Sequence, residues 1–471
     1  MRWIVAILFF VVSPSYCFSA ACPETIAQGE TTSCDSITQY GITWTFVSNE
    51  TVGQFVNGDY FVINDGTVVV SVSPDGCTEA STCKHGSMVN PTASSKQGHD
   101  YRAGNFDFTT AVQFPYTMVS NDSLMSTVSW ETTGYHYSLT GDYVQESHGY
   151  LKSAAVLTCL ATQPASGSFR PGYAGATKQI YNISDLQTSR LQNFPQSGAL
   201  TESYLATPGL TYTDIYKRPW IHYGADWLGR AIHPTDNMPN YYRESFGLDS
   251  EAAMLLHTNI SEKTELLYNF IQRGIDMASV EKTKTTYGDR MISKAVLVFT
   301  GVMLGDSTIS SLSSGREISQ VYYGTGWAGQ TVLWRDKVDL EYESTTLGQW
   351  KDVVVAAGCG CKAEAYRRDS HSWNWVGSAL AIRLMNGISA FNKPEYFDYV
   401  DRWMTEADQE AAIVAECSQD QTKSGTQPQC WSYSDYPASG ASSSAFVTGA
   451  WTEYRNWSAG QRYAVRAVTN E

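Results

Sequence analysis

The stretch Tyr60-Phe-Val-Ile-Asn-Asp-Gly-Thr-Val-Val-Val-Ser-Val72 decides the first half of the fold, because an Asn-Asp-Gly turn separates two runs of β-branched and aromatic residues. Such side chains favour strands, and Asn, Asp and Gly favour turns. Similar runs lie at 42–46, 126–130 and 154–160. Residues 22–162 are therefore predicted to form a β-rich domain, most simply an antiparallel sandwich-like one.

After residue 216 the apolar residues follow a helical spacing. In 264–278 they recur every three or four positions, as expected for a helix with one buried face. Residues 216–471 therefore predict a mainly helical domain of the α/α-toroid type, reached through a Ser-, Gly- and Pro-rich connecting segment at 163–215. The expected fold class is α+β and multidomain, with a site on the loops at one end of the helices. Further helices are predicted at 250–257, 293–304, 373–385, 395–404 and 444–457.

Residues 1–21 have the layout of a secretory signal peptide. Arg2 precedes an apolar run at 3–12, and small residues lie at 19–21. The run is too short to span a bilayer, and no later segment is long and apolar enough to do so. We expect a secreted, periplasmic or cell-surface protein without a transmembrane segment; a lipid anchor on Cys22 is the alternative.

The charge balance is strongly acidic. The formal net charge of −15 becomes −16 when Arg2 is removed with the signal peptide. A chain with this charge and no basic cluster is not expected to bind nucleic acid. An anionic substrate is compatible with it if the cleft itself is locally cationic.

The spacing of the cysteines favours short-range disulfides in an oxidising compartment. Cys159 lies in an apolar run and is expected to be a buried thiol, and the neighbouring Cys359 and Cys361 are expected in a loop. No pair of motifs has zinc-ligand spacing, so neither a metal nor another cofactor is expected. Asn-x-Ser/Thr sequons at Asn49, Asn121, Asn182, Asn259 and Asn456 are possible surface glycosylation sites. The predicted disulfides are Cys22–Cys34, Cys77–Cys83 and Cys417–Cys430.

Three segments of the helical half concentrate aromatic, amide and cationic residues: 218–244, 288–294 and 366–375. Such groups suit elimination of a glycosidic bond beside a uronate. Amide and cationic donors neutralise the carboxylate, a base takes the acidified proton, and an acid protonates the leaving oxygen. Catalysis is assigned to His233, His371, Tyr242 and Tyr366. Substrate binding is assigned to Asn237, Tyr241, Arg243, Arg290, Lys294, Arg368, Trp373 and Asn374.

The motifs at 86–91, 169–175, 232–240, 298–306, 375–385 and 397–404 resemble known proteins. The broadest likeness, over about 40–457, is to a family of uncharacterised secreted bacterial proteins. The helical half also resembles the α/α-toroid polysaccharide lyases of the alginate- and chondroitin-lyase type, which implies Asn, His, Tyr and Arg in a cleft. In those lyases the β domain commonly follows the toroid, whereas here it precedes it.

The sequence predicts a secreted carbohydrate-active enzyme, a polysaccharide lyase that cleaves a uronic-acid-containing glycan by β-elimination. One alternative is an α/α glycoside hydrolase with a carboxylate pair drawn from Asp226, Asp236, Glu244 and Asp369. Another is a non-catalytic glycan-binding or structural protein of the extracellular space. In each case the expected partner is an extracellular polysaccharide.

Overall fold

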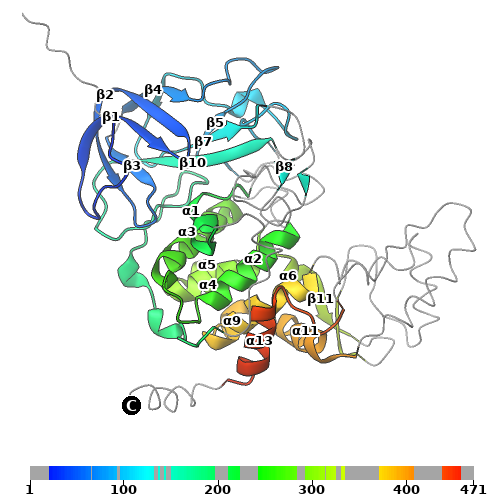
Figure 1. Cartoon of the computed structure of the whole chain (residues 1–471). Helices are drawn as coiled ribbons and strands as arrows, with labels where there is room; N and C mark the ends of the chain where they lie inside the picture. The colour runs from blue at the N-terminus through cyan, green and yellow to red at the C-terminus, as the bar shows by residue number, and fades with distance from the viewer. Residues whose placement is uncertain are drawn as a thin grey trace, which may run out of the picture.

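The computed structural model describes residues 21–64, 66–92, 96–131, 136–137, 143–144, 150–196, 210–222, 242–283, 292–312, 315–324, 330–334, 371–407 and 438–457. Within these residues a β-rich front half precedes a helical back half (Figure 1). The predicted α+β organisation is confirmed.

The strands of the front half join in one sheet of eight strands, in the order β5-β7-β10-β3-β2-β4-β6 with β1 beside β2. The β10–β3 pair is parallel and the other pairs are antiparallel, so the sheet is mixed. A separate two-stranded ladder pairs β8 (His136–Tyr137) with β9 (Tyr143–Val144). The eight strands are β1 (Thr32–Gln39), β2 (Ile42–Gln54), β3 (Tyr60–Ile63), β4 (Thr67–Ser73), β5 (Ser87–Val89), β6 (Tyr116–Met118), β7 (Ser123–Ser129) and β10 (Leu151–Leu160).

Strand β2 organises the sheet. Tyr40 and Gly41 both have positive φ, at 51° and 80°, as a tight hairpin turn between β1 and β2 requires. The first part of β2 pairs with β4 and its last three residues pair with β3. The predicted turn after Ile63 therefore separates two strands that both pair with β2 and not with each other.

Strand β10 contributes side chains to two apolar cores. Ala155 and Leu157 pack inside the sheet's own core, whereas Ala154 and Val156 pack against the helical half. Successive side chains of a strand point to opposite faces, so this apolar run is explained by burial on both sides. The sheet is curled, and Trp44 Nε1 of β2 donates to Ser126 Oγ of β7 across 3.0 Å. The described strands do not confirm two stacked sheets of a sandwich.

The described helices of the back half pack around α2, which is in contact with α9, η7 and α13 (Figure 1). A complete α/α toroid is not confirmed by the described helices. A hairpin of β11 (Val321–Tyr323) and β12 (Val332–Trp334) lies against α11. The helices are α1 (Tyr212–Lys217), α2 (Tyr242–Leu255), α3 (Lys263–Lys282), α4 (Lys294–Leu304), α5 (Ser307–Ser310), α6 (Arg316–Ser319), the 3-10 helix η7 (Ser372–Trp375), α9 (Val376–Leu384), α10 (Ile388–Phe391), α11 (Pro394–Thr405) and α13 (Ala445–Tyr454).

The ends of the helices lie at the capping residues that the sequence provides. The Ser293 side chain caps α4 by accepting from Val296 N, and Gly305 ends it with φ of 67°. Ser444 caps α13 in the same way. Pro394 begins α11, where its missing N–H costs nothing. The predicted helices at 293–304, 395–404 and 444–457 are confirmed to within a few residues.

The connecting segment packs against both halves instead of running over the surface. Phe169, Tyr173 and Phe194 belong to the core shared with the helices. Between them, buried Arg170 donates to Asp59 Oδ2 at 2.5 Å and to both Asp276 carboxylate oxygens at 2.6 and 2.9 Å. Arg170 therefore links the residue that precedes β3 with α3. The segment also contains the short 3-10 helices η2 (Ile183–Asp185) and η3 (Thr188–Arg190).

Two of the predicted disulfides are present, Cys22–Cys34 and Cys77–Cys83. Cys159 is buried, and its thiol donates to Asn64 O at 2.7 Å. The pairing of Cys417 with Cys430, the loop with Cys359 and Cys361, and the signal peptide lie outside the described residues. Among the described helices, none has the length and apolar character that a membrane crossing requires.

Candidate functional site

The described part of the chain contains an open groove in the β half and a more enclosed cavity in the helical half. No group of three or more His, Cys, Asp or Glu side chains among the described residues is placed to hold a metal ion. The groove has a volume of about 640 Å³, within the range of pockets that hold small ligands. It lies beside the Cys77–Cys83 loop and is lined by Ser81, Lys96, Asn105, Phe106, Asp107 and Phe108.

The apolar floor of the groove is fixed by the disulfide. The partly buried rings of Phe106 and Phe108 pack against a small core formed by Cys77, Cys83 and Ala111. Aromatic rings held in this way offer contact area with little loss of freedom on binding. The groove therefore has a preformed apolar surface.

An ion pair provides the polar part of the groove. Lys96 Nζ donates to Asp107 Oδ2 at 2.6 Å, while Asp107 Oδ1 accepts from the backbone N–H and hydroxyl of Thr109. The hydrogen bond from Lys96 lowers the pKa of Asp107 to about 2. The Asp107 carboxylate is therefore ionised near neutral pH, and the charges of Lys96 and Asp107 cancel. At the rim, exposed Asn105 adds an amide group and exposed Ser81 adds a hydroxyl group.

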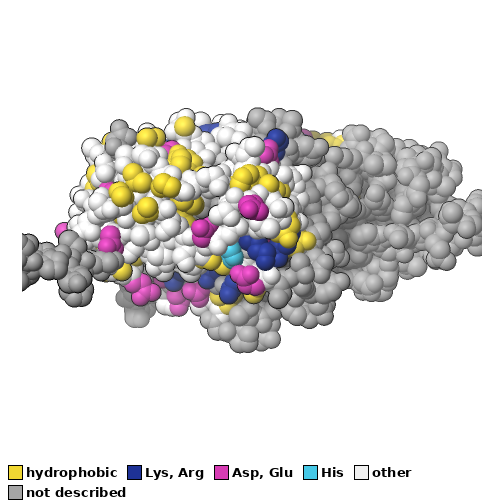
Figure 2. Space-filling view, turned by 90° about the horizontal axis from the view of Figure 1, so that it is seen from above, with side chains coloured by type: hydrophobic (Ala, Val, Ile, Leu, Met, Phe, Trp, Pro, Cys, Tyr) yellow, Lys and Arg dark blue, Asp and Glu magenta, His cyan; other side chains and the backbone are white. Residues whose placement is uncertain are grey.

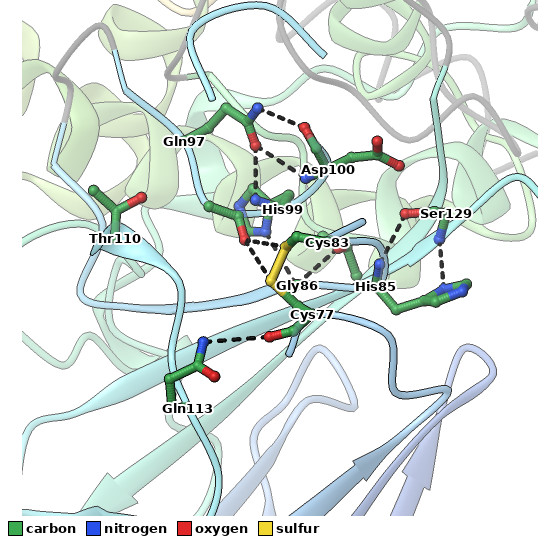
Figure 3. Close-up of a disulfide and its surroundings, with 12 residues drawn as sticks. Cys77, Cys83, His85, Gly86, Gln97, His99, Asp100, Thr110, Gln113 and Ser129 are labelled. Atoms are coloured by element: carbon green, nitrogen blue, oxygen red, sulfur yellow. Dashed lines mark hydrogen bonds between the residues drawn. A yellow bond between two sulfur atoms is a disulfide. The ribbon is translucent and has the colours of Figure 1, made fainter. Parts of the chain in front are cut away.

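The loop that carries these residues is held by one buried amide, as Figure 3 shows. Gln97 Oε1 accepts from the backbone N–H groups of His99 and Asp100 at 2.7 and 3.1 Å. Its Nε2 donates to the carbonyls of Asp100 and Ala103 at 2.9 and 3.2 Å. Because one side chain satisfies four backbone groups, the loop keeps its shape without regular secondary structure.

His99 supports the same loop from below (Figure 3). Its carbonyl accepts from Gly86 N at 2.8 Å, and any Cβ on Gly86 would overlap the carbonyl of Gly98. Burial lowers the pKa of His99 to about 4, so the ring is neutral at physiological pH. Its Nδ1 lies 3.2 Å from Gly86 O and in the neutral ring donates to it. His99 is therefore part of the framework and not a proton carrier at neutral pH.

Arg102 ties the far end of the loop to β7. It makes a bidentate pair with Asp100 at 2.7 and 2.9 Å and donates to Trp130 O at 2.8 Å. Its guanidinium lies 4.9 Å from the centroid of the Tyr150 ring, a favourable cation–π distance. These contacts make the loop a rigid support for the groove.

A buried histidine, His85, lies next to this framework. Ser129 N donates to His85 Nδ1 at 3.0 Å, so the neutral ring carries its proton on Nε2, which faces Glu131 Oε1 at 3.2 Å. Burial lowers the pKa of His85, more than neighbouring Glu131 raises it. Figure 2 shows the molecule from above, where hydrophobic side chains gather on one part of the surface and acidic and basic side chains lie around them.

The structure buries three of the residues predicted to form the site. His371 lies between the rings of Trp334 and Trp375, at centroid distances of 5.6 and 5.3 Å. Asn374 is fully buried beside it. Lys294 is 2 % exposed and donates to the carbonyls of Ser310 and Leu312. In this arrangement a polysaccharide does not reach these three side chains.

The other predicted residues are only partly described. Trp373 is partly buried, and Tyr242 and Arg243 begin α2 with side chains that are not described. The assignments of these residues stay predictions. His233, Asn237, Tyr241, Arg290, Tyr366 and Arg368 lie outside the described residues.

Two of the three predicted segments meet at α2. Ser250 of α2 donates to Asn374 O of the third segment, and Gly377 lies against Ser250. From the first segment, His222 Nε2 accepts from Arg273, which pairs with Asp249 of α2 at 2.8 and 2.9 Å. Arginine has no acceptor, so the neutral His222 ring carries its proton on Nδ1.

The groove was not predicted from the sequence, although its disulfide was. The sequence signal for the groove is Asn105-Phe-Asp-Phe108, where polar and aromatic residues alternate and the spacing is not helical. That pattern also fits a short edge strand, so spacing alone does not distinguish the two.

Comparisons of the chain with protein-family models, with curated proteins and with solved structures each found no match. The function therefore rests on the chemistry of the described residues.

Proposed function

We propose that the protein binds an extracellular polysaccharide in the groove beside the Cys77–Cys83 loop. The observation that carries this proposal is the pair of partly buried rings, Phe106 and Phe108, next to the Lys96–Asp107 ion pair. The C–H face of a sugar ring packs on an aromatic ring, whereas its hydroxyls need donors and acceptors. The groove supplies both kinds of contact.

The charge of the groove favours a neutral or weakly acidic sugar. The charges of Lys96 and Asp107 cancel, so the groove itself offers no net positive charge to attract a strongly acidic polymer. The two disulfides are compatible with an extracellular location. Export by a signal peptide at 1–21 belongs to the same proposal.

Titration with neutral and acidic polysaccharides tests the groove. Phe106→Ala is expected to weaken binding about tenfold, which corresponds to about 1.4 kcal/mol. Because Phe106 also packs on the disulfide core, Ser81→Trp, which fills the groove from its exposed rim, provides a second variant. Val47→Ala, at a side chain that is 64 % exposed elsewhere on the sheet, is the control. Unchanged binding in both groove variants excludes the groove.

We also propose β-elimination of a uronic-acid polymer as the catalytic activity of the helical half. What supports it is that Asn374 of the third segment bonds to α2 directly and His222 of the first segment is joined to α2 through Arg273 of α3. The first turn of α2 contains Tyr242. Incubation with alginate, glucuronan, chondroitin and pectin is expected to raise the ultraviolet absorbance of the unsaturated product. Tyr242→Phe is expected to abolish the rise while the Val47→Ala control retains it.

The outcome of that incubation separates the alternatives. Release of reducing ends without absorbance, abolished by Asp236→Asn, selects the glycoside hydrolase. Polysaccharide binding without any product selects a non-catalytic binding protein. If absorbance does not rise with any uronate polymer, the lyase is excluded, and the groove is still tested by its own variants.

A further inference from the structure

The cavity of the helical half lies between the connecting segment and the last two turns of α3 and opens to solvent at one side. Its volume is about 210 Å³. One wall is formed by the segment around Gly172 to Tyr181, the other by Ile275, Ala278 and Ser279, and Ile309 of α5 closes one end. The cavity is separate from the groove, which lies in the β half.

The space exists because the facing residues are small and their backbones are fixed. A Cβ on Gly172 would overlap the Ser279 side chain, and Gly175 has φ of 68°. Ala174 N donates to Ser279 Oγ at 3.1 Å, which holds the segment against α3. Larger side chains at these positions would fill the cavity or displace the segment.

The inner part of the cavity is apolar, because its polar atoms have partners in the protein. Ser279 Oγ donates to Asp276 O at 2.7 Å, and the Tyr181 hydroxyl donates to Asp306 at 2.5 Å. The remaining inner contacts come from Ile275, Ala278 and Ile309, all nearly fully buried. A hydrocarbon group therefore suits this part better than a polar one.

The mouth of the cavity has the opposite character. Thr177, Gln179 and Lys282 line it and are exposed. They offer a hydroxyl, an amide and an ammonium group, a donor-rich set that suits a carboxylate. Lys282 lies in the last turn of α3, where its charge also offsets the negative end of the helix.

We propose that this cavity binds a small carboxylic acid with an apolar body about the size of one ring. An apolar cavity of about 150 Å³ is enough to hold benzene, so 210 Å³ accommodates a ring with a short side chain. The ring lies among Ile275, Ala278 and Ile309, and the carboxylate lies at Lys282. The inference does not depend on the proposed polysaccharide binding.

Titration of the full chain with phenylacetate, followed by NMR or calorimetry, tests the proposal. Saturable binding is expected, and 2-phenylethanol is expected to bind about threefold to fivefold more weakly, as for the loss of an exposed ion pair. Lys282→Gln is expected to remove that difference by weakening phenylacetate alone. Lys152→Gln, at an exposed lysine of the β half, is the control.

Ala278→Leu is expected to abolish binding of both probes by filling the cavity. Because a larger side chain at a buried position can disturb folding, Ala176→Phe at the exposed mouth gives an independent block. Absence of saturable phenylacetate binding, or binding that survives both filling variants, overturns the cavity assignment. Equal affinity for the acid and the alcohol overturns the assignment of the carboxylate to Lys282.

Discussion

The groove and the cavity are held in place by different kinds of interaction. In the β half, a disulfide and the neutral amide of Gln97 fix the loop around the groove, with the Arg102–Asp100 pair at its far end. In the helical half, buried ionisable groups hold the elements in place. Arg170 joins the connecting segment to α3, and α2 contains the buried acid Glu251. The β half is therefore expected to respond to reductant, and the helical half to pH and to loss of charge.

The largest expected effect is at Arg170. Arg170→Met leaves Asp59 and Asp276 buried without their cation, which is expected to lower the free energy of unfolding by about 3–5 kcal/mol. Urea unfolding measures the change. Arg170→Lys, which keeps the charge but not the bidentate geometry, is expected to lose less. A loss for Arg170→Met that is no larger than the loss for the exposed Lys96→Ala variant contradicts the structural role of Arg170.

Removal of the Cys77–Cys83 bridge is expected to cost about 2 kcal/mol, since it closes a loop of only six residues in sequence separation. The double variant Cys77→Ser/Cys83→Ser is compared with Cys22→Ser/Cys34→Ser, whose bridge spans 12 residues. Both pairs should lower the unfolding midpoint, but only loss of Cys77–Cys83 should weaken polysaccharide binding. If the two double variants bind polysaccharide equally well, binding in the groove does not depend on the Cys77–Cys83 disulfide.

Glu251 is expected to make the helical half sensitive to alkaline pH. Burial raises its pKa from 4.5 to about 8, and the Tyr212 hydroxyl donates to the carboxyl. The folded state thus retains a proton that the unfolded chain releases, so stability is complete below pH 4.5 and decreases as pH rises through 8. Glu251→Gln removes this dependence and is expected to add about 1–2 kcal/mol at pH 8.

Thermal unfolding of the parent and Glu251→Gln from pH 4 to 9 checks that sign. The two curves should coincide at the acidic end and separate as pH rises. The stability of Glu251→Gln minus that of the parent should increase from pH 4 to pH 8. A decrease contradicts a protonated Glu251 in the folded state. Glu265→Gln, at a half-exposed carboxylate on α3, is a matched control.

The smallest expected effect on stability is at the exposed Lys96–Asp107 pair. Lys96→Ala should leave the unfolding midpoint unchanged, because exposed ion pairs contribute little. The same variant should weaken polysaccharide binding severalfold by removing a donor from the groove. A change in stability without a change in binding would reverse the assigned roles.

Much of the fold could be predicted because its signals are local. The turn chemistry around Asn64 and Gly66, the cap at Ser293 and the spacing of Leu266, Phe270 and Ile275 each act within a few residues. Pairing of β4 with β2 and not with β3 could not be predicted, because it joins residues far apart in sequence, such as Thr43 and Ser73. Periodicity does not encode which strands meet.

The candidate site was harder to predict for the same reason. His371 and Lys294 have residue types that suit catalysis, yet the structure surrounds them with tryptophan rings and backbone carbonyls. Composition does not reveal whether a polar side chain faces solvent or a core. Phe106 and Asp107 have ordinary residue types, and only the folded loop places them at a concave surface.

The two faces of β10 have a consequence for attempts to divide the chain. Ala154 and Val156 are covered by the helical half, as are Met125 and Leu151 nearby. A fragment of residues 22–162 produced alone would expose this apolar area to water and is expected to self-associate. Truncation at the change from strands to helices therefore cuts through one cooperative unit, and separate expression of the halves calls for a redesigned strand surface.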